Sequence, residues 1–225
     1  MKNPVLLGML YALGQSLCFA GVSLCVKLAA DEHSTVEALF YRNFISFLII
    51  GGILAAMGQL YKIKGANLKW QFARAFIGSS SMFVTFLAFE ELPLSEAQAL
   101  LFAAPLFVVA LSYPVLKEVV GPWRMSAALA GFAGVLLIVQ PGAISSNLGA
   151  FYALTAAFGH AAVMLLLRHI GKSEDALVTV FYFSAFGTLM VVPFLPFYFT
   201  WPTGDMMFVF TALGGLAAVL QIFLT

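Results

Sequence analysis

The side chains that could contact a small molecule are mostly uncharged and lie inside long apolar runs of the sequence. A polar group without a partner in lipid costs free energy, so we expect these side chains to face a bundle interior or a water-filled path. A serine can instead bond to its own helix, and a lone histidine more often packs than binds a ligand. The predicted polar cavity is lined by Gln15, Ser16, Ser79, Ser80, Phe83, Gln98, His160 and Gln221.

Four charged residues near the ends of apolar runs form a second candidate group. Arg42 lies seven residues into its run, about 10 Å along a helix, and therefore needs a carboxylate or carbonyl partner. Glu90 and Glu91 end a later run and are its predicted partners, whereas Lys27 can extend from the first run to the membrane surface. Two interpretations remain open: these charges form an ion pair at the outer mouth of the cavity, or they are simply exposed.

The sequence does not carry the patterns of the common catalytic or metal sites. It has no G-x-S-x-G, no H-E-x-x-H and no pair of aspartates inside an apolar run, which argues against an enzyme. Cys18 and Cys25 are interpreted as small packing residues, because a metal site needs more ligands than two, and no cofactor is predicted. A net charge of +1 argues against a nucleic-acid partner.

The composition requires that these residues be positioned by membrane-spanning helices. The chain of 225 residues is 62% hydrophobic and 9% charged, with a mean hydropathy of +1.00. Lipid admits only helices or closed barrels, and the apolar runs are too long for barrel strands. The prediction is an all-α integral membrane protein in contact with the lipid bilayer. The eight predicted spans are residues 4–29, 35–57, 71–90, 96–116, 122–139, 148–169, 176–198 and 206–225.

An internal repeat organises these spans. Residues 7–27 (LGMLYALGQSLCFAGVSLCVK) match residues 148–168 (LGAFYALTAAFGHAAVMLLLR) at an offset of 141 residues without a gap. Further along, Phe40 and Tyr41 meet Phe181 and Tyr182, while Phe183 takes the place of Arg42. Five spans precede the second copy, so the copy enters the membrane from the opposite side, as in inverted-repeat transporters. The predicted repeat units are residues 4–142 and 148–225.

The distribution of basic residues predicts the orientation. With the N-terminus in the cytoplasm, nine of the eleven Lys and Arg residues, including Arg74, fall on the cytoplasmic side, and Lys27 and Arg42 fall outside. Trp70, Trp123 and Trp201 all lie at span ends, where interfacial rings are expected.

Several segments in order resemble the EamA family, a branch of the drug/metabolite transporter superfamily. They are residues 86–97 (FLAFEELPLSEA), 104–107 (APLF), 117–118 (KE) and 130–142 (AGFAGVLLIVQPG). The resemblance implies a ten-helix fold of two inverted five-helix units around a central cavity, lined by the first, third, fourth, sixth and eighth spans. It implies an inner-membrane carrier that moves a small organic metabolite by alternating access.

The expected substrate is amino-acid-like, aromatic or otherwise neutral or zwitterionic, because the predicted cavity is rich in amides and aromatic rings, and export is the expected direction. An importer of a vitamin or nucleoside-like compound and a non-transporting membrane scaffold are the alternatives, and a homodimer is left open. Against the family pattern, the counterparts of residues 90–142 are missing from the second unit. We therefore expect two more spans in a chain of roughly 280 residues, at about 20 residues per span.

Overall fold

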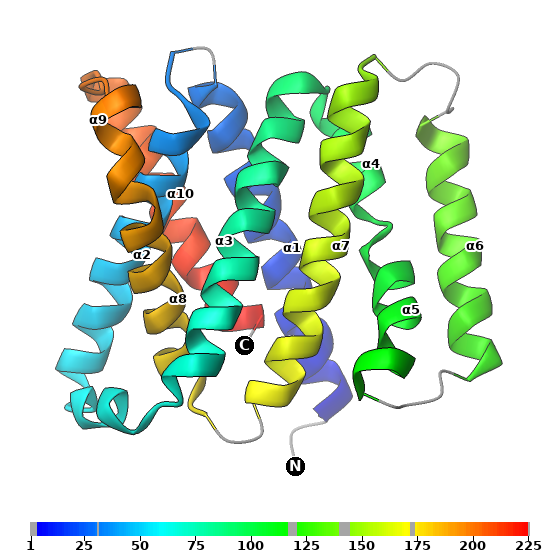
Figure 1. The fold of residues 1–225 in the computed structure, drawn as a ribbon, viewed down its shortest axis with the longest axis horizontal. Coiled ribbons are helices and arrows are strands. Elements are labelled where there is room, and N and C mark those ends of the chain that lie inside the picture. The colour runs from blue at the N-terminus through cyan, green and yellow to red at the C-terminus, as the bar shows by residue number, and fades with distance from the viewer. Residues whose placement is uncertain (1–3, 31, 117–120, 140–144, 172–173, 225) are drawn as a thin grey trace. The chain divides into compact units, whose positions relative to one another are not determined.

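A computed structural model describes residues 4–30, 32–116, 121–139, 145–171 and 174–224, and no strand occurs in these ranges. Five residues of the family-like segments lie outside the described residues: Lys117, Glu118, Gln140, Pro141 and Gly142. The helices in chain order are α1 (Pro4–Ala29), α2 (Thr35–Ala56), η1 (Leu60–Gly65), α3 (Leu68–Glu91), α4 (Leu94–Leu101), α5 (Ala104–Leu116), α6 (Pro122–Val139), α7 (Asn147–Ile170), α8 (Ala176–Val191), η2 (Val192–Phe194), α9 (Leu195–Tyr198) and α10 (Gly204–Leu224) (Figure 1).

Seven helical segments among the described residues are long and apolar enough to cross a membrane, so the chain is a multi-pass α-helical membrane protein. The fifth predicted span, residues 122–139, forms α6 with the predicted bounds, but its described apolar part, Met125–Gly134, is shorter, and its crossing stays a prediction. The seven segments are Gly8–Ala29, Thr35–Ala56, Leu68–Glu91, Leu94–Ser112, Asn147–Ile170, Ala176–Tyr198 and Gly204–Leu224.

The fourth predicted span is broken near its centre. α4 ends at Leu101, a turn covers Phe102 and Ala103, and α5 begins at Ala104 with Pro105 in its first turn. A proline fits the first turn of a helix because the amide there has no intrahelical partner, but it cannot continue the preceding helix. The span is therefore two short helices joined inside the membrane.

The described residues divide into two compact units, each treated separately below. Unit 1 comprises Met1–Phe76 and Ile170–Thr225, and unit 2 comprises Ile77–His169. The first part of α3 belongs to unit 1 and the rest to unit 2. The predicted repeat units, residues 4–142 and 148–225, follow the sequence rather than this spatial division and stay a prediction.

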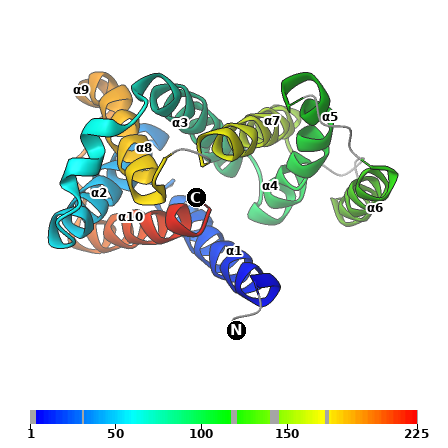
Figure 2. The ribbon, with the colours of Figure 1, turned by 90° about the horizontal axis from the view of Figure 1, so that it is seen from below.

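In unit 1, α2 packs against both α8 and α10, and α10 also runs along α1 (Figures 1 and 2). The packing is close because small residues face large ones. Ser46 on α2 donates a hydrogen bond of 2.8 Å to the carbonyl of Gly214 on α10, and a side chain at Gly214 would overlap Ile45. The apolar core between the three helices is formed by Ile50, Leu54, Val180 and Ala218.

In unit 2, a row of small residues on α7 packs against the later part of α3. The row repeats every four residues, which places it on one helix face, and the close approach of α3 is typical of small residues between membrane helices. A side chain at Gly149 would meet Leu92, and one at Gly159 would overlap Ser81. The row is Gly149, Ala153, Ala157 and Ala161, all of them buried.

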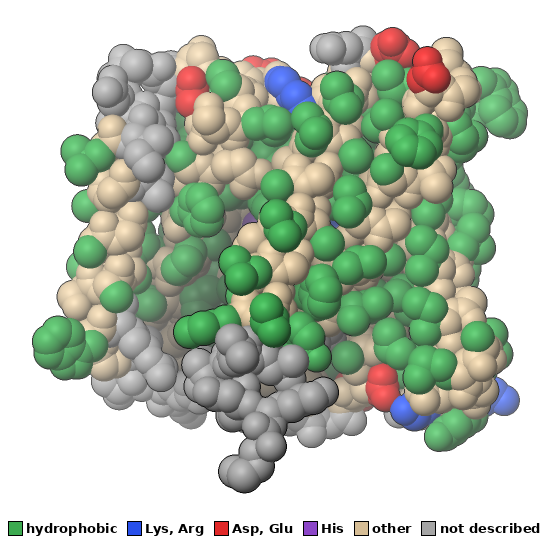
Figure 3. Space-filling view, turned by 180° about the vertical axis from the view of Figure 1, so that it is seen from behind, with side chains coloured by type: hydrophobic (Ala, Val, Ile, Leu, Met, Phe, Trp, Pro, Cys, Tyr) green, Lys and Arg blue, Asp and Glu red, His purple; other side chains and the backbone are tan. Residues whose placement is uncertain are grey.

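The surface agrees with a membrane setting. Figure 3 shows mostly hydrophobic side chains between the helix ends and acidic and basic side chains near those ends. Among the exposed large hydrophobic residues are Leu17, Phe197 and Phe208, each more than 70% exposed. In water such exposure would be costly. In a bilayer these side chains would contact lipid.

One ion pair of unit 1 lies outside the spans and ties η1 to the start of α8. Lys62 donates a hydrogen bond of 2.8 Å to Asp175, and Asp175 caps α8 by accepting from the amide of Leu177. The hydrogen bond from Lys62 lowers the pKa of Asp175 below its ordinary value of 3.8, and the same bond raises the pKa of Lys62 above 10.5. The stabilisation from Asp175 is therefore present above pH 3.8 and is lost as the pH falls through its lowered pKa.

We expect Asp175→Asn to lower the melting temperature at neutral pH, because asparagine keeps the helix cap but not the ion pair. The difference from the unsubstituted protein should close in acid, where Asp175 is protonated, and shrink in high salt, because the pair is about one-third exposed. Thermal unfolding in detergent at about pH 7 and at about pH 2, well below the ordinary pKa of 3.8, measures this. An equal difference at both pH values would contradict it.

Candidate functional site

Two buried arginines meet on one aromatic ring inside unit 1. The guanidinium carbons of Arg42 on α2 and Arg74 on α3 lie 5.5 and 4.5 Å from the ring centre of Phe183 on α8. Arg42 is 2% exposed and Arg74 is 0% exposed. Each lies six or seven residues past the start of its helix, about 10 Å along it, so both are placed inside the span.

The arginines have few polar partners. Arg42 donates a hydrogen bond of 2.7 Å to the side-chain oxygen of Asn43, and Arg74 donates one of 2.8 Å to the side-chain oxygen of Gln221 on α10. Among the described residues, no carboxylate is within ion-pair distance of either guanidinium. Three buried guanidinium nitrogens have no hydrogen-bond partner: Nε of Arg42, and Nε and Nη1 of Arg74.

Two buried amide side chains near the arginines are also only partly satisfied. Gln71, one turn before Arg74 on α3, donates a hydrogen bond of 3.2 Å to Thr179 on α8, but its oxygen has no partner. The amide nitrogen of Asn43 has none either. The Arg42–Arg74 site, defined as these two arginines with Asn43, Gln71, Phe183 and Gln221, therefore has more unused donors than acceptors.

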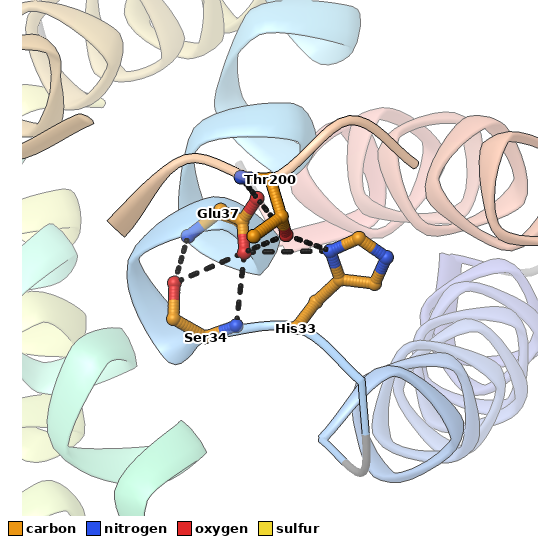
Figure 4. Close-up of polar contacts among 4 residues, drawn as sticks. All are labelled: His33, Ser34, Glu37 and Thr200. Atoms are coloured by element: carbon orange, nitrogen blue, oxygen red, sulfur yellow. Dashed lines mark hydrogen bonds and ion pairs between the residues drawn. The ribbon is translucent and has the colours of Figure 1, made fainter. Parts of the chain in front are cut away.

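A second polar cluster in unit 1 surrounds Glu37, at the start of α2 (Figure 4). The buried carboxylate accepts hydrogen bonds from the backbone amides of Ser34 (3.0 Å) and Thr200 (2.6 Å) and from the hydroxyl of Thr200 (3.0 Å). Ser34 and Glu37 form a capping box for α2. The His33 ring lies 3.4 Å from Glu37 and 3.0 Å from the Thr200 hydroxyl. This cluster joins the α1–α2 connection to the segment before α10.

In unit 2, a polar contact joins α3 and α7. The Thr85 hydroxyl is 3.3 Å from Nε2 of His160 and donates a hydrogen bond of 2.8 Å to the carbonyl of Ser81. Ser81 in turn donates to the carbonyl of Ile77. The buried Ser79 hydroxyl has no partner. The hydroxyls of Ser81 and Thr85 bond to carbonyls of their own helix, whereas the Ser79 hydroxyl does not. His160 and Ser79 therefore stay candidates for ligand contact.

The other predicted cavity residues are scattered. Gln221 lies in the Arg42–Arg74 site of unit 1, while Gln15, Phe83 and Gln98 are only partly buried. Ser80 is exposed, because three consecutive serines cannot share one helix face. Ser16 is also exposed, beside an apolar surface hollow of α1, and its hydroxyl donates to the carbonyl of Ala12. Two of the predicted residues, Gln221 and Arg42, share the Arg42–Arg74 site, and the predicted cavity as a whole stays a prediction.

The predicted outer mouth stays a prediction. Arg42 is buried against Phe183 in unit 1, whereas Glu90 and Glu91 belong to unit 2 and are exposed. Glu91 accepts a hydrogen bond of 3.2 Å from Ser146. Lys27 is partly buried in the last turn of α1.

Sequence reasoning missed Arg74 as a site residue and counted it with the cytoplasmic charges. α3 begins at Leu68, three residues before the predicted start at Gln71, and this moves Arg74 almost one turn deeper. Phe183 was noticed only as a difference between the repeats. Its alignment with Arg42 was the signal that could have identified the pair.

We expect Thr85→Val to destabilise the protein by about 1 kcal/mol, because it removes a hydroxyl that bonds Ser81 and contacts His160 while keeping the side-chain volume. The matched control is Thr211→Val on α10, whose exposed hydroxyl bonds only to its own helix at Met207. Unfolding in detergent compares the two variants. An equal effect of both substitutions would show that the contact with His160 does not contribute.

The fold and its buried polar groups define a multi-pass helical membrane protein with buried arginine and amide side chains within its spans. The chain belongs to the EamA-like transporter family, because the model of that family matches residues 6–140. This confirms the family suggested by the sequence segments.

Curated relatives extend the similarity beyond the family match. The human solute carrier family 35 member G1 is 27% identical over 97% of this chain and 64% of its own length. The riboflavin transporter of Vibrio cholerae is 28% identical over 86% of this chain and 65% of its own. The pseudopaline exporter CntI of Pseudomonas aeruginosa is 27% identical over 84% and 66%, respectively. The chain thus spans about two thirds of the length of these relatives.

A solved crystal structure has the same fold. It superposes with a TM-score of 0.70, covering 95% of this chain and 78% of the other, at 20% sequence identity. At this identity the likeness concerns the fold alone.

Proposed function

We propose that the protein carries a small organic metabolite across the inner membrane by alternating access. Family membership is the observation that carries the proposal, supported by relatives named as transporters. Buried polar side chains within the spans add to it, since such residues commonly mark a substrate path. The proposed substrate class is amino-acid-like, aromatic or otherwise neutral or zwitterionic.

Export is the proposed direction, and import of a vitamin or nucleoside-like compound is the second candidate. One relative is named an exporter of pseudopaline and others are named riboflavin transporters. Riboflavin is the obvious first test compound for the second candidate, because it is aromatic and the sequence contains 23 phenylalanines.

Transport is tested with the full-length protein in liposomes. Vesicles loaded with a mixture of labelled amino acids, or with riboflavin, should lose label faster than protein-free vesicles, and excess unlabelled compound should compete. The control protein is Gly214→Leu, whose helix packing is disturbed, as discussed below. Equal release with and without protein across a metabolite library would overturn the proposal and favour a non-transporting scaffold.

The proposed orientation places the N-terminus in the cytoplasm. Lys64 at the end of η1 and Glu32 before α2 are both exposed, and α2 lies between them. In a background without Cys18 and Cys25, cysteines introduced at these two positions should react from opposite sides of the membrane. An impermeant thiol reagent added outside intact cells should label Glu32→Cys and leave Lys64→Cys unmodified. Labelling of both positions from outside would contradict the orientation.

A further inference from the structure

We infer that the Arg42–Arg74 site binds the carboxylate group of the transported metabolite. The inference rests on the proposed transport function and names the chemical group that the protein would recognise. It changes the earlier expectation of an uncharged cavity, because Arg74 lies inside the span rather than at its end.

The site holds two positive charges that no carboxylate balances among the described residues. Two guanidinium groups, at most 2% exposed, lie on one ring within membrane-spanning helices. Arginine stays protonated in proteins, and a buried cation is costly unless it is paired. Cation–π contact with Phe183 compensates only part of that cost, because one such contact contributes about 1–2 kcal/mol. No carboxylate of the described residues supplies the rest.

The site also has more unused hydrogen-bond donors than acceptors. Three guanidinium nitrogens and the amide nitrogen of Asn43 have no acceptor, against one unused acceptor, the oxygen of Gln71. A ligand that completes this site must therefore bring acceptors and negative charge. Unused buried donors cost about 1–3 kcal/mol each, so an anion that satisfies them would gain that amount.

The shape of the guanidinium groups favours a carboxylate over other anions. A guanidinium presents a planar fork of donors that matches a carboxylate with two parallel bonds. Chloride offers no such geometry, and doubly charged phosphate loses more hydration free energy on entering a span. An organic carboxylate also brings an apolar body that suits the ring of Phe183. An amino-acid-like zwitterion has this group.

Equilibrium binding tests the inference without requiring transport. Benzoate should raise the melting temperature of the full-length protein in detergent, with saturation, while neutral benzamide of the same shape should not. Chloride and phosphate at equal ionic strength should have no such effect. If benzamide, chloride or phosphate stabilises the protein as much as benzoate does, the inference is overturned.

Three variants locate the binding. Arg74→Gln should weaken benzoate binding by at least about tenfold, the loss of one charge-assisted hydrogen bond, and Arg168→Gln, at an exposed arginine of α7, is the matched control. Gln221→Glu tests the site without removing an arginine. It replaces the amide that accepts from Arg74 at 2.8 Å with a carboxylate, which would neutralise the charge that benzoate needs. That variant should be at least as stable as the original and should bind benzoate at least about tenfold more weakly.

Unchanged benzoate affinity in Gln221→Glu would mean that the arginines serve only the fold, and the inference would fail. This failure is distinct from failure of the proposed function. If the protein transports a metabolite but does not bind benzoate through Arg74, only the inference is wrong. If the protein binds benzoate through Arg74 but transports no metabolite, the proposed function is wrong and the anion site remains.

Discussion

Replacement of Gly214 by leucine is expected to lower the free energy of unfolding by about 3 kcal/mol, the upper end of typical overpacking costs. An added Cβ would overlap the side chain of Ile45 and lie 3.3 Å from the carbonyl of Tyr41. Since the obstacle is partly backbone, α10 must move away from α2. That movement would also break the hydrogen bond from Ser46 to the Gly214 carbonyl.

The adjacent glycine provides the control. A Cβ at Gly215 would meet no heavy atom within 4 Å, so leucine there should fit. Both substitutions change intrinsic helix propensity by the same amount, about 0.8 kcal/mol in favour of leucine. The difference between the two variants in thermal unfolding therefore reports packing alone. If Gly215→Leu is as destabilising as Gly214→Leu, the close α2–α10 contact is not the cause.

Glu37→Ala is expected to destabilise the protein by about 3 kcal/mol, because it leaves several buried donors without an acceptor. The carboxylate is 0% exposed and accepts from the amides of Ser34 and Thr200 and from the Thr200 hydroxyl. Alanine also removes half of the capping box of α2. Unfolding in detergent, followed by tryptophan fluorescence, measures the loss.

Glu32→Ala is the control for this substitution. Glu32 is an exposed carboxylate in the same connection between α1 and α2, so its removal should cost no more than about 0.5 kcal/mol. Thr200→Val should fall between the two, because it removes one hydroxyl and keeps the amide that bonds Glu37. Equal stability of Glu37→Ala and Glu32→Ala would show that the Glu37 cluster does not stabilise the contact between the α1–α2 connection and the segment before α10.

The helices themselves were predictable because a bilayer restricts the chain so strongly. Backbone groups in lipid must bond within their own helix, so length and hydropathy determine most of each span. The predicted residues 4–29 and 122–139 are the observed bounds of α1 and α6, and residues 176–198 cover α8, η2 and α9. The fourth span breaks just before Pro105, because a proline cannot continue the preceding helix.

The polar clusters were only partly predictable, because their partners are far apart in the sequence. Gln221 was expected to contact a ligand, but nothing local indicates that it accepts from Arg74, 147 residues earlier. Thr200 and Glu37 are 163 residues apart, and neither residue type alone indicates the other. Phe183 is one of 23 phenylalanines and has no distinguishing local pattern. Such contacts depend on the tertiary packing of α2, α3, α8 and α10.

The contact between Arg42 and Phe183 also bears on symmetry. The offset of 141 residues aligns Arg42 with Phe183, and in the predicted inverted repeat, residues that contact their own counterparts would lie near the axis that relates the two units. Two arginines at such an axis would repel each other, and two phenylalanines would leave Arg74 as the one guanidinium on the ring. One cation and one aromatic ring attract each other. In place of two like side chains, the two aligned positions thus form a cation–π contact.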